Sequence, residues 1–229
     1  MSDANVKSRL STRLVYKLSK KEEAINAITH GITALILIVT APLAVMRTQR
    51  NAGSDAIKDV FAVSVFIICL VLMFTSSAVY HVLPAKSPYK PVWNRLDHMA
   101  IFLAIAGTYT PVALSVIGGR TGWLIFGFEW LLVLAGILFK TFHFKKNKKT
   151  WVISILLYLL MGWAVVLCMP AFIARAQTAN LWLIFTGGLF YTIGILFFAQ
   201  KWRYSHVVWH GFVMAGALSH FVAIVFFLR

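Results

Sequence analysis

The sequence is short of charged residues and of cysteine. Only 13% of its 229 residues are charged, whereas 60% are hydrophobic, and a soluble domain is nearer one quarter charged. This composition excludes a soluble globular fold, because the surplus apolar surface must face lipid. The two cysteines, Cys69 and Cys168, lie within apolar runs, so there is no disulfide framework and no CxxC-type metal motif.

Acidic residues are scarcer still than basic ones, 7 against 22, which gives a net charge of +15. A charge of this size can indicate nucleic-acid binding. However, the lysines and arginines fall between the apolar runs and not along one amphipathic face, a pattern typical of membrane proteins. We therefore expect membrane lipids, and no nucleic acid, as partners.

Long apolar runs dominate the rest of the sequence. A run of about 20 such residues can cross a bilayer as a helix, and the connectors between the runs are short. The sequence therefore predicts an all-α integral membrane protein, a seven-helix transmembrane bundle over residues 21–229 that follows a basic arm, residues 1–20. The predicted spans are 24–46, 60–83, 96–117, 121–140, 151–170, 180–200 and 206–228.

The distribution of positive charge predicts the orientation of the bundle. The amino-terminal arm and every second connector together hold sixteen of the 22 lysines and arginines. Because positively charged loops stay in the cytoplasm, we expect a cytoplasmic N-terminus and an external C-terminus. Ser19 and Glu22 have the spacing of a capping box, which would start the first helix just before the membrane.

Polar residues of several predicted helices fall at the same, cytoplasmic end. Ionisable groups are costly in a bilayer, so such a set indicates a functional site. His81 ends the second span, Asp97 begins the third, and His206 and His210 begin the seventh. The first span starts with Glu23, Asn26 and His30 at the same level.

The spacing of these residues favours a zinc site. His206 and His210 are four residues apart, which places both imidazoles on one helix face. His81 would complete three-histidine coordination and leave the fourth position for water, as in catalytic zinc sites. Asp97 would hold or deprotonate that water, and Ser77, one turn from His81, would orient a ligand or the water.

Simpler interpretations remain open for each of these groups. The His206 and His210 pair could form structural hydrogen bonds only. Asp97 could pair with Arg95 or cap a helix, and Ser77 could bond to its own helix backbone.

Four other histidines are expected to lie outside the site. His30 and His98 are expected to be solvated at the headgroup boundary, and His143 to be solvated in a basic connector. His220 is ten residues beyond His210, about 15 Å along the helix, and is expected to form an interhelical hydrogen bond.

Four segments in order resemble the family that contains the bacterial haemolysin III-type proteins and the progestin and adipoQ receptors: Glu22–His30, Ser77–His81, Leu96–Pro111 and His206–Gly211. Among bacterial members, the chain is most similar to inner-membrane homeostasis proteins. The resemblance implies a seven-helix bundle with a cytoplasmic N-terminus.

The resemblance also implies a role for each site residue. His81, His206 and His210 would bind zinc, Asp97 would reach it through water, and Ser77 matches the family's serine. Because the wider superfamily includes alkaline ceramidases, we expect a zinc-dependent hydrolase of a lipid-like amide or ester, with a role in membrane lipid or energetic homeostasis.

Two other functions stay open at this point. One is a receptor or signalling module in which zinc is structural. The other is a pore-forming cytolysin, as the historical family name implies, although seven apolar spans leave no soluble state from which a toxin could insert.

Overall fold

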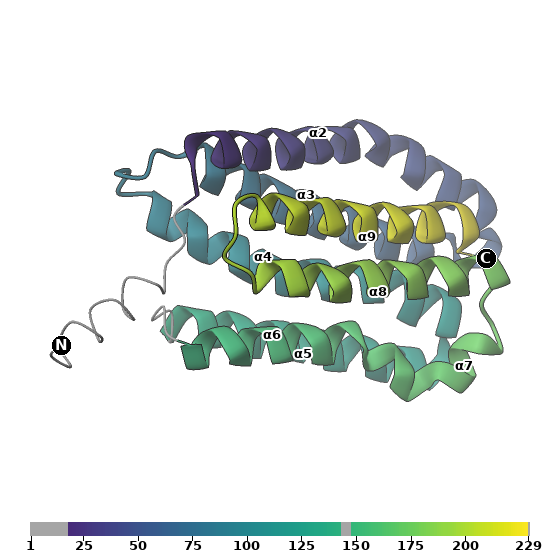
Figure 1. The fold of residues 1–229 in the computed structure, drawn as a ribbon. Helices are drawn as coiled ribbons and strands as arrows, with labels where there is room; N and C mark the ends of the chain where they lie inside the picture. The colour runs from purple at the N-terminus through teal and green to yellow at the C-terminus, as the bar shows by residue number, and fades with distance from the viewer. Residues whose placement is uncertain (1–17, 143–147, 229) are drawn as a thin grey trace, which may run out of the picture.

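The computed structural model describes residues 18–142 and 148–228, so most of the predicted basic arm and His143 lie outside the described residues. The described residues contain seven helical stretches that are long and apolar enough to cross a membrane (Figure 1). The elements are α2 (Lys20–Asn51), η1 (Gly53–Asp55), α3 (Ala56–Val82), α4 (Lys90–Pro111), the π-helical η2 (Val112–Ile117), α5 (Gly119–Phe142), α6 (Lys148–Gly162), η3 (Ala164–Cys168), α7 (Met169–Ile173), α8 (Thr178–Phe198) and α9 (Ser205–Phe227).

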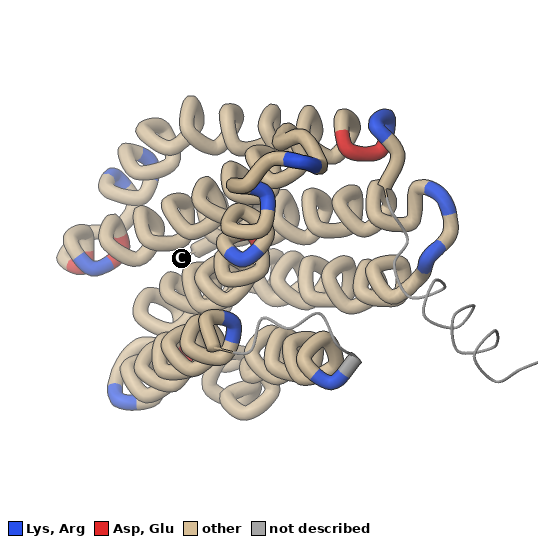
Figure 2. The backbone as a smooth tube through the Cα atoms, turned by 90° about the vertical axis from the view of Figure 1, so that its left-hand side faces the viewer, with Lys and Arg blue, Asp and Glu red and all other residues tan. Residues whose placement is uncertain are grey.

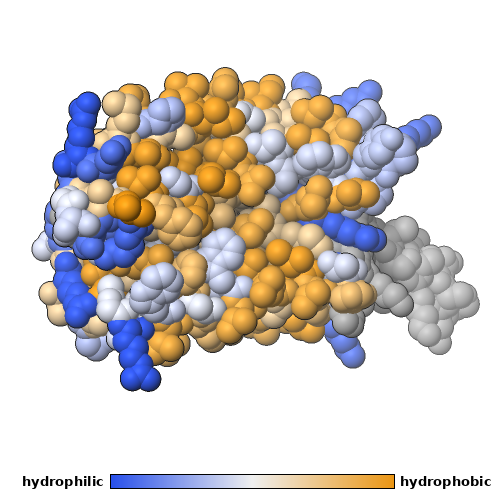
Figure 3. Space-filling model, turned by 180° about the vertical axis from the view of Figure 1, so that it is seen from behind, coloured by the Kyte–Doolittle hydropathy of each residue, from blue (hydrophilic) through white to orange (hydrophobic). Residues whose placement is uncertain are grey.

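The sides of the bundle are apolar. A broad hydrophobic belt lies between two hydrophilic ends (Figure 3), and long uncharged stretches of helix separate the lysines and arginines (Figure 2). Leu43, Leu131 and Leu167 are 66%, 66% and 80% exposed. A continuous apolar surface of this kind belongs in lipid. The predicted multi-pass, seven-helix membrane protein is therefore confirmed, and the orientation of its termini stays a prediction.

The helices bring the starts of α2, α4 and α9 and the end of α3 to one end of the bundle (left in Figure 1). We call this the amino-terminal end; the C-terminus lies at the other. α3 packs against both α2 and α4, and α9 packs against α8 and α2. The polar residues predicted to share one level thus lie on helices that contact each other.

The first helix begins as the capping box predicts. The Glu22 backbone N–H donates to Ser19 Oγ at 3.3 Å, and Glu22 Oε2 accepts the Ser19 backbone N–H at 2.9 Å. These bonds satisfy backbone groups that the start of a helix leaves without partners. The Glu22 side chain is thereby held at the start of the helix.

The third span differs from its predicted bounds, 96–117, at its start. The helix begins at Lys90, with Pro91 in its first turn, where proline's missing N–H costs nothing. Its first two turns interleave charged and polar residues with apolar ones, so a search for an unbroken apolar run places the start too late. The span ends in a turn at Gly118 and Gly119, whose φ angles of 60° and 58° lie in a region open to glycine.

The fifth span, predicted as one helix over 151–170, is interrupted. α6 ends at Gly162, and η3 and α7 complete the crossing. The hydroxyl of Tyr109 donates to the Gly162 carbonyl at 2.9 Å and accepts the Val165 backbone N–H at 2.7 Å. Broken helices are tolerated within a membrane where side chains satisfy the freed backbone groups, so Tyr109 makes the interruption possible.

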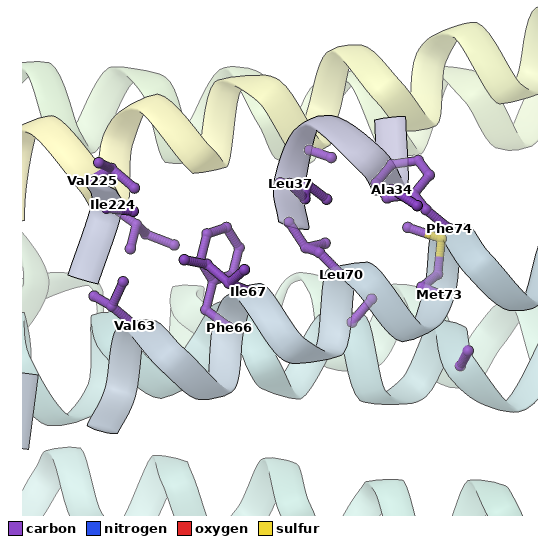
Figure 4. Close-up of a cluster of buried hydrophobic side chains, with 14 of the residues drawn as sticks. Ala34, Leu37, Val63, Phe66, Ile67, Leu70, Met73, Phe74, Ile224 and Val225 are labelled. Atoms are coloured by element: carbon purple, nitrogen blue, oxygen red, sulfur yellow. The ribbon is translucent and has the colours of Figure 1, made fainter. Parts of the chain in front are cut away.

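A hydrophobic core joins α2, α3 and α9. Figure 4 shows Leu37 of α2 near Leu70 of α3, and Ile224 of α9 near Phe66 of α3, within one cluster of buried side chains. Phe66 and Ile224 are fully buried. This packing fixes α9 beside α3, and it therefore positions the histidines that these two helices carry at the amino-terminal end.

Candidate metal centre

Three histidines from two helices meet at the amino-terminal end of the bundle. His81 lies in the last turn of α3, and His206 and His210 lie in the first two turns of α9. One ring nitrogen of each lies within 4.8 Å of the others, and the ring centroids are 4.7–5.3 Å apart. The structure therefore brings together the three residues that the sequence predicted as ligands.

The histidine cluster contains buried nitrogen atoms without hydrogen-bond partners. His81 and His210 are each 3% exposed, and His206 is half-buried. His81 Nε2 and His210 Nδ1 have no hydrogen-bond partner among the residues that the structure describes. Because buried polar atoms almost always have a partner, these two nitrogens are available to a ligand.

This donor set suits a divalent metal ion. Three neutral imidazoles with an open fourth position make up the ligand set of catalytic zinc sites, and imidazole suits zinc among the common metals. The group of His81, His206 and His210 could therefore hold one such ion, and these residues fit zinc.

Glu23 and Lys90 extend the cluster. Glu23 Oε2 lies 2.6 Å from His81 Nδ1, and Lys90 Nζ donates to Glu23 Oε1 at 3.0 Å. A metal-binding histidine commonly donates its second ring N–H to a carboxylate. The sequence placed Glu23 at this level but gave it no role, since its contact with His81 spans 58 positions of the chain.

Asp97 and Ser77 lie beside the histidine cluster and outside the group of close nitrogens. The Ser77 hydroxyl is within hydrogen-bonding reach of the Asp97 carboxylate, which also interacts electrostatically with His81. Asp97 Oδ2 is 3.7 Å from His98 Nδ1. α4 begins at Lys90, so Asp97 does not cap this helix. Its predicted contact with the metal through water stays a prediction.

His30 was expected to be solvated, and this expectation is wrong. Its imidazole is 2% exposed and stacks on His210, with ring centroids 3.7 Å apart and planes 9° apart. Within residues 18–142 and 148–228, neither of its ring nitrogens has a hydrogen-bond partner, and neither does either amide atom of the fully buried Asn26. The position of His30 along the chain predicts its depth in the membrane. It does not predict which face of α2 points into the bundle, because packing against the other helices determines that face.

The two other described histidines lie outside the cluster. His220 Nε2 donates to the Ile184 carbonyl at 3.0 Å, which confirms the predicted interhelical hydrogen bond. His98 is partly exposed and its Nδ1 donates to the Asn94 carbonyl at 2.8 Å. Its expected solvation is therefore only partial.

A cavity of about 450 Å³ lies further along the bundle. Its walls are mainly apolar and aromatic and come from α4, η2, the end of α6, η3, α7, α8 and α9. Thr108 and His220 line it together with Tyr109, Trp163 and Phe185. His220 is ten residues from His210, about 15 Å along α9. Size and lining match a pocket for a small apolar ligand.

The amino-acid sequence is similar to one protein family and to bacterial proteins named hemolysins. It matches the family described as haemolysin-III related over residues 18–221. It is 34% identical over 208 residues to the Hemolysin-3 homolog of Bacillus subtilis (strain 168), which covers 90% of this chain and 94% of that protein. Hemolysin-3 of Bacillus cereus is 32% identical over 209 residues, covering 91% and 92%.

A human protein is more distantly similar. Monocyte to macrophage differentiation factor of Homo sapiens is 26% identical over 221 residues, covering 91% of this chain and 85% of that protein. The family match includes the positions of all three clustered histidines.

Proposed function

Since the chain belongs to the haemolysin III-related family, we propose that it is a zinc-dependent hydrolase of a lipid-like amide or ester. The proposed site is the cytoplasmic end of a bundle in the bacterial inner membrane, and the proposed role is membrane lipid or energetic homeostasis. The observation that carries the proposal is the buried cluster of three imidazoles with unpartnered nitrogens.

The residues around the histidine cluster have the chemistry that hydrolysis needs. His81, His206 and His210 would hold the zinc ion, which would supply Lewis-acid polarisation of a carbonyl group and activation of water. The Asp97 carboxylate then accepts a proton from the attacking water and returns it to the leaving group. The Ser77 side chain is close enough to influence that carboxylate and would help to orient it.

The apolar cavity supports a lipid-like substrate. Its polar lining residues, Thr108 and His220, lie about 15 Å along the helices from Asp97 and His210. In this proposal the acyl chain of the substrate occupies the apolar cavity, and its polar group would have to extend over this distance to the histidine cluster.

A structural role for zinc is the second candidate. An ion that joins α3 to α9 would stabilise a receptor or signalling module without turnover. The open fourth position argues against it, because structural zinc sites are usually closed by four protein ligands.

The relatives named hemolysins raise a third candidate, a cytolysin. If a few copies of the purified protein per liposome release an entrapped dye, this result would favour the cytolysin over hydrolysis.

Variants of Asp97 separate hydrolysis from a structural role. Detergent-purified protein loaded with zinc is assayed against a panel of lipid amides and esters, with Asp97→Asn and Ser77→Ala measured in parallel. We expect Asp97→Asn to keep its zinc and to lose turnover by at least about 10²-fold, the usual contribution of a general base. Asp55→Asn, a change at the other end of the bundle, is the matched control.

Two outcomes would contradict the proposal. Zinc-loaded wild-type protein that hydrolyses no member of the panel would favour the structural role. Turnover that survives in Asp97→Asn at the wild-type rate would remove Asp97 from the reaction.

A further inference from the structure

Glu23 connects the first helix to the histidine cluster. Its Oε2 atom lies 2.6 Å from His81 Nδ1, while the His81 side chain is fully buried and that of Glu23 is 23% exposed. His81 therefore has one ring nitrogen engaged by a carboxylate, and its other nitrogen, Nε2, is the buried atom without a partner.

The Glu23 carboxylate is itself held on both sides. Its second oxygen accepts from Lys90 Nζ at 3.0 Å, and the same ammonium group donates to the Leu83 carbonyl at 2.7 Å. Leu83 follows α3 and Lys90 begins α4. A carboxylate with both oxygens engaged cannot rotate away, so it fixes the orientation of the His81 ring.

Its neighbour Glu22 has a different task. Glu22 Oε1 accepts the Tyr204 backbone N–H at 2.7 Å, and Oε2 accepts from Ser19. Glu22 thus holds the start of α2 against the α8–α9 connection, and Glu23 is left to contact the histidine cluster. Both carboxylates interact electrostatically with His206, so they place negative charge beside a site whose own ligands are neutral.

We propose that Glu23 is a positioning residue of the metal centre, which fixes the tautomer and ring orientation of His81 and adds the negative charge that a divalent ion favours. The Nδ1–H of His81 donates to Glu23, so Nε2 is the nitrogen left for the metal. The inference rests on the proposed metal site, and it adds the residue by which α2 controls that site. Loss of such a partner typically weakens metal binding by about 10–100-fold.

Zinc titration of purified protein tests this proposal. Wild type, Glu23→Gln and Glu23→Leu are titrated in detergent against a competing chelator. Gln keeps an oxygen that accepts from His81 but lacks the charge, and Leu lacks both. We expect affinity to fall in that order, with a loss of about 10–100-fold for Leu. Asp55→Asn, a carboxylate change at the opposite end of the bundle, should bind like wild type.

Two further measurements separate positioning from a structural ion pair. Thermal unfolding without metal should change little in Glu23→Gln, whereas zinc-dependent stabilisation should fall by about 1.4 kcal/mol for each tenfold loss of affinity. The visible absorption of the cobalt-substituted protein should shift, because cobalt reports the geometry of its ligands. By contrast, Glu22→Ala should lower stability without metal, since Glu22 caps α2.

The possible failures are distinguishable. Wild-type protein that binds no metal would overturn the proposed function and this inference with it. Wild-type protein that binds zinc while Glu23→Leu binds equally well, with an unchanged cobalt spectrum, would overturn this inference alone.

Discussion

The interruption of the fifth span gives a prediction that can be worked from two hydrogen bonds. The Tyr109 hydroxyl donates to the Gly162 carbonyl and accepts from the Val165 backbone N–H. Tyr109→Phe removes one oxygen atom and keeps the ring that packs against η3. The change therefore leaves two backbone groups without the partner that Tyr109 supplies, beside a mainly apolar cavity.

The expected cost follows from these groups. A buried donor or acceptor left without a partner costs about 1–3 kcal/mol. The Val165 N–H accounts for most of this cost. Buried backbone carbonyl groups with incomplete hydrogen bonding are more common in proteins than buried N–H groups without a partner. We therefore expect Tyr109→Phe to lower the free energy of unfolding by about 2 kcal/mol.

Tyr158→Phe is the matched control. The Tyr158 hydroxyl donates one bond, at 2.9 Å, to the His98 carbonyl, which lies in the interior of α4, so its removal leaves no backbone N–H without a partner. We expect a loss near 0.6 kcal/mol, the average for interhelical hydrogen bonds in membranes. Denaturant titration in mixed micelles measures both variants, and hydrogen exchange at Val165 should accelerate only in Tyr109→Phe. Equal losses of stability in the two variants would refute the reasoning.

Three further changes test the packing and the polar groups of the bundle. Gly187→Ala places a methyl group 2.3 Å from the His220 ring, so thermal unfolding should show a loss of about 1–3 kcal/mol; Gly127→Ala, with open space around it, should show none. Ser19→Ala removes the helix cap and should cost about 1 kcal/mol by denaturant titration, and an unchanged midpoint would contradict the capping box. Asn26→Leu replaces a buried amide without partners, so the melting temperature should stay the same or rise; a clear fall would show that the amide is bonded.

The sequence was sufficient to predict the seven crossings and the three clustered histidines. Apolar runs of bilayer length are a strong signal, and alternation of direction from one span to the next fixes which residues share an end of the bundle. The spacing of four between His206 and His210 then places two ligands on one face. These inferences need only helix geometry and the order of the spans.

Other features depend on tertiary contacts that no local pattern reports. The first turns of α4 mix charged, polar and apolar residues and therefore look like a connector. The break after Gly162 is stabilised by Tyr109 from another helix. The burial of His30 depends on which side of α2 faces α9. One signal was available for this face: Glu23, Asn26 and His30 are three and four residues apart, so they share one side of a helix.

The metal content of the purified protein tests the central claim most directly. Detergent-purified wild type, His210→Ala and His220→Gln are analysed for zinc per chain by mass spectrometry, with folding checked by circular dichroism. His220→Gln is the control, since His220 lies about 15 Å from the histidine cluster along α9. We predict close to one zinc per chain in wild type and in His220→Gln, and its loss in His210→Ala. Folded wild-type protein without zinc, or full zinc content in His210→Ala, would contradict the account.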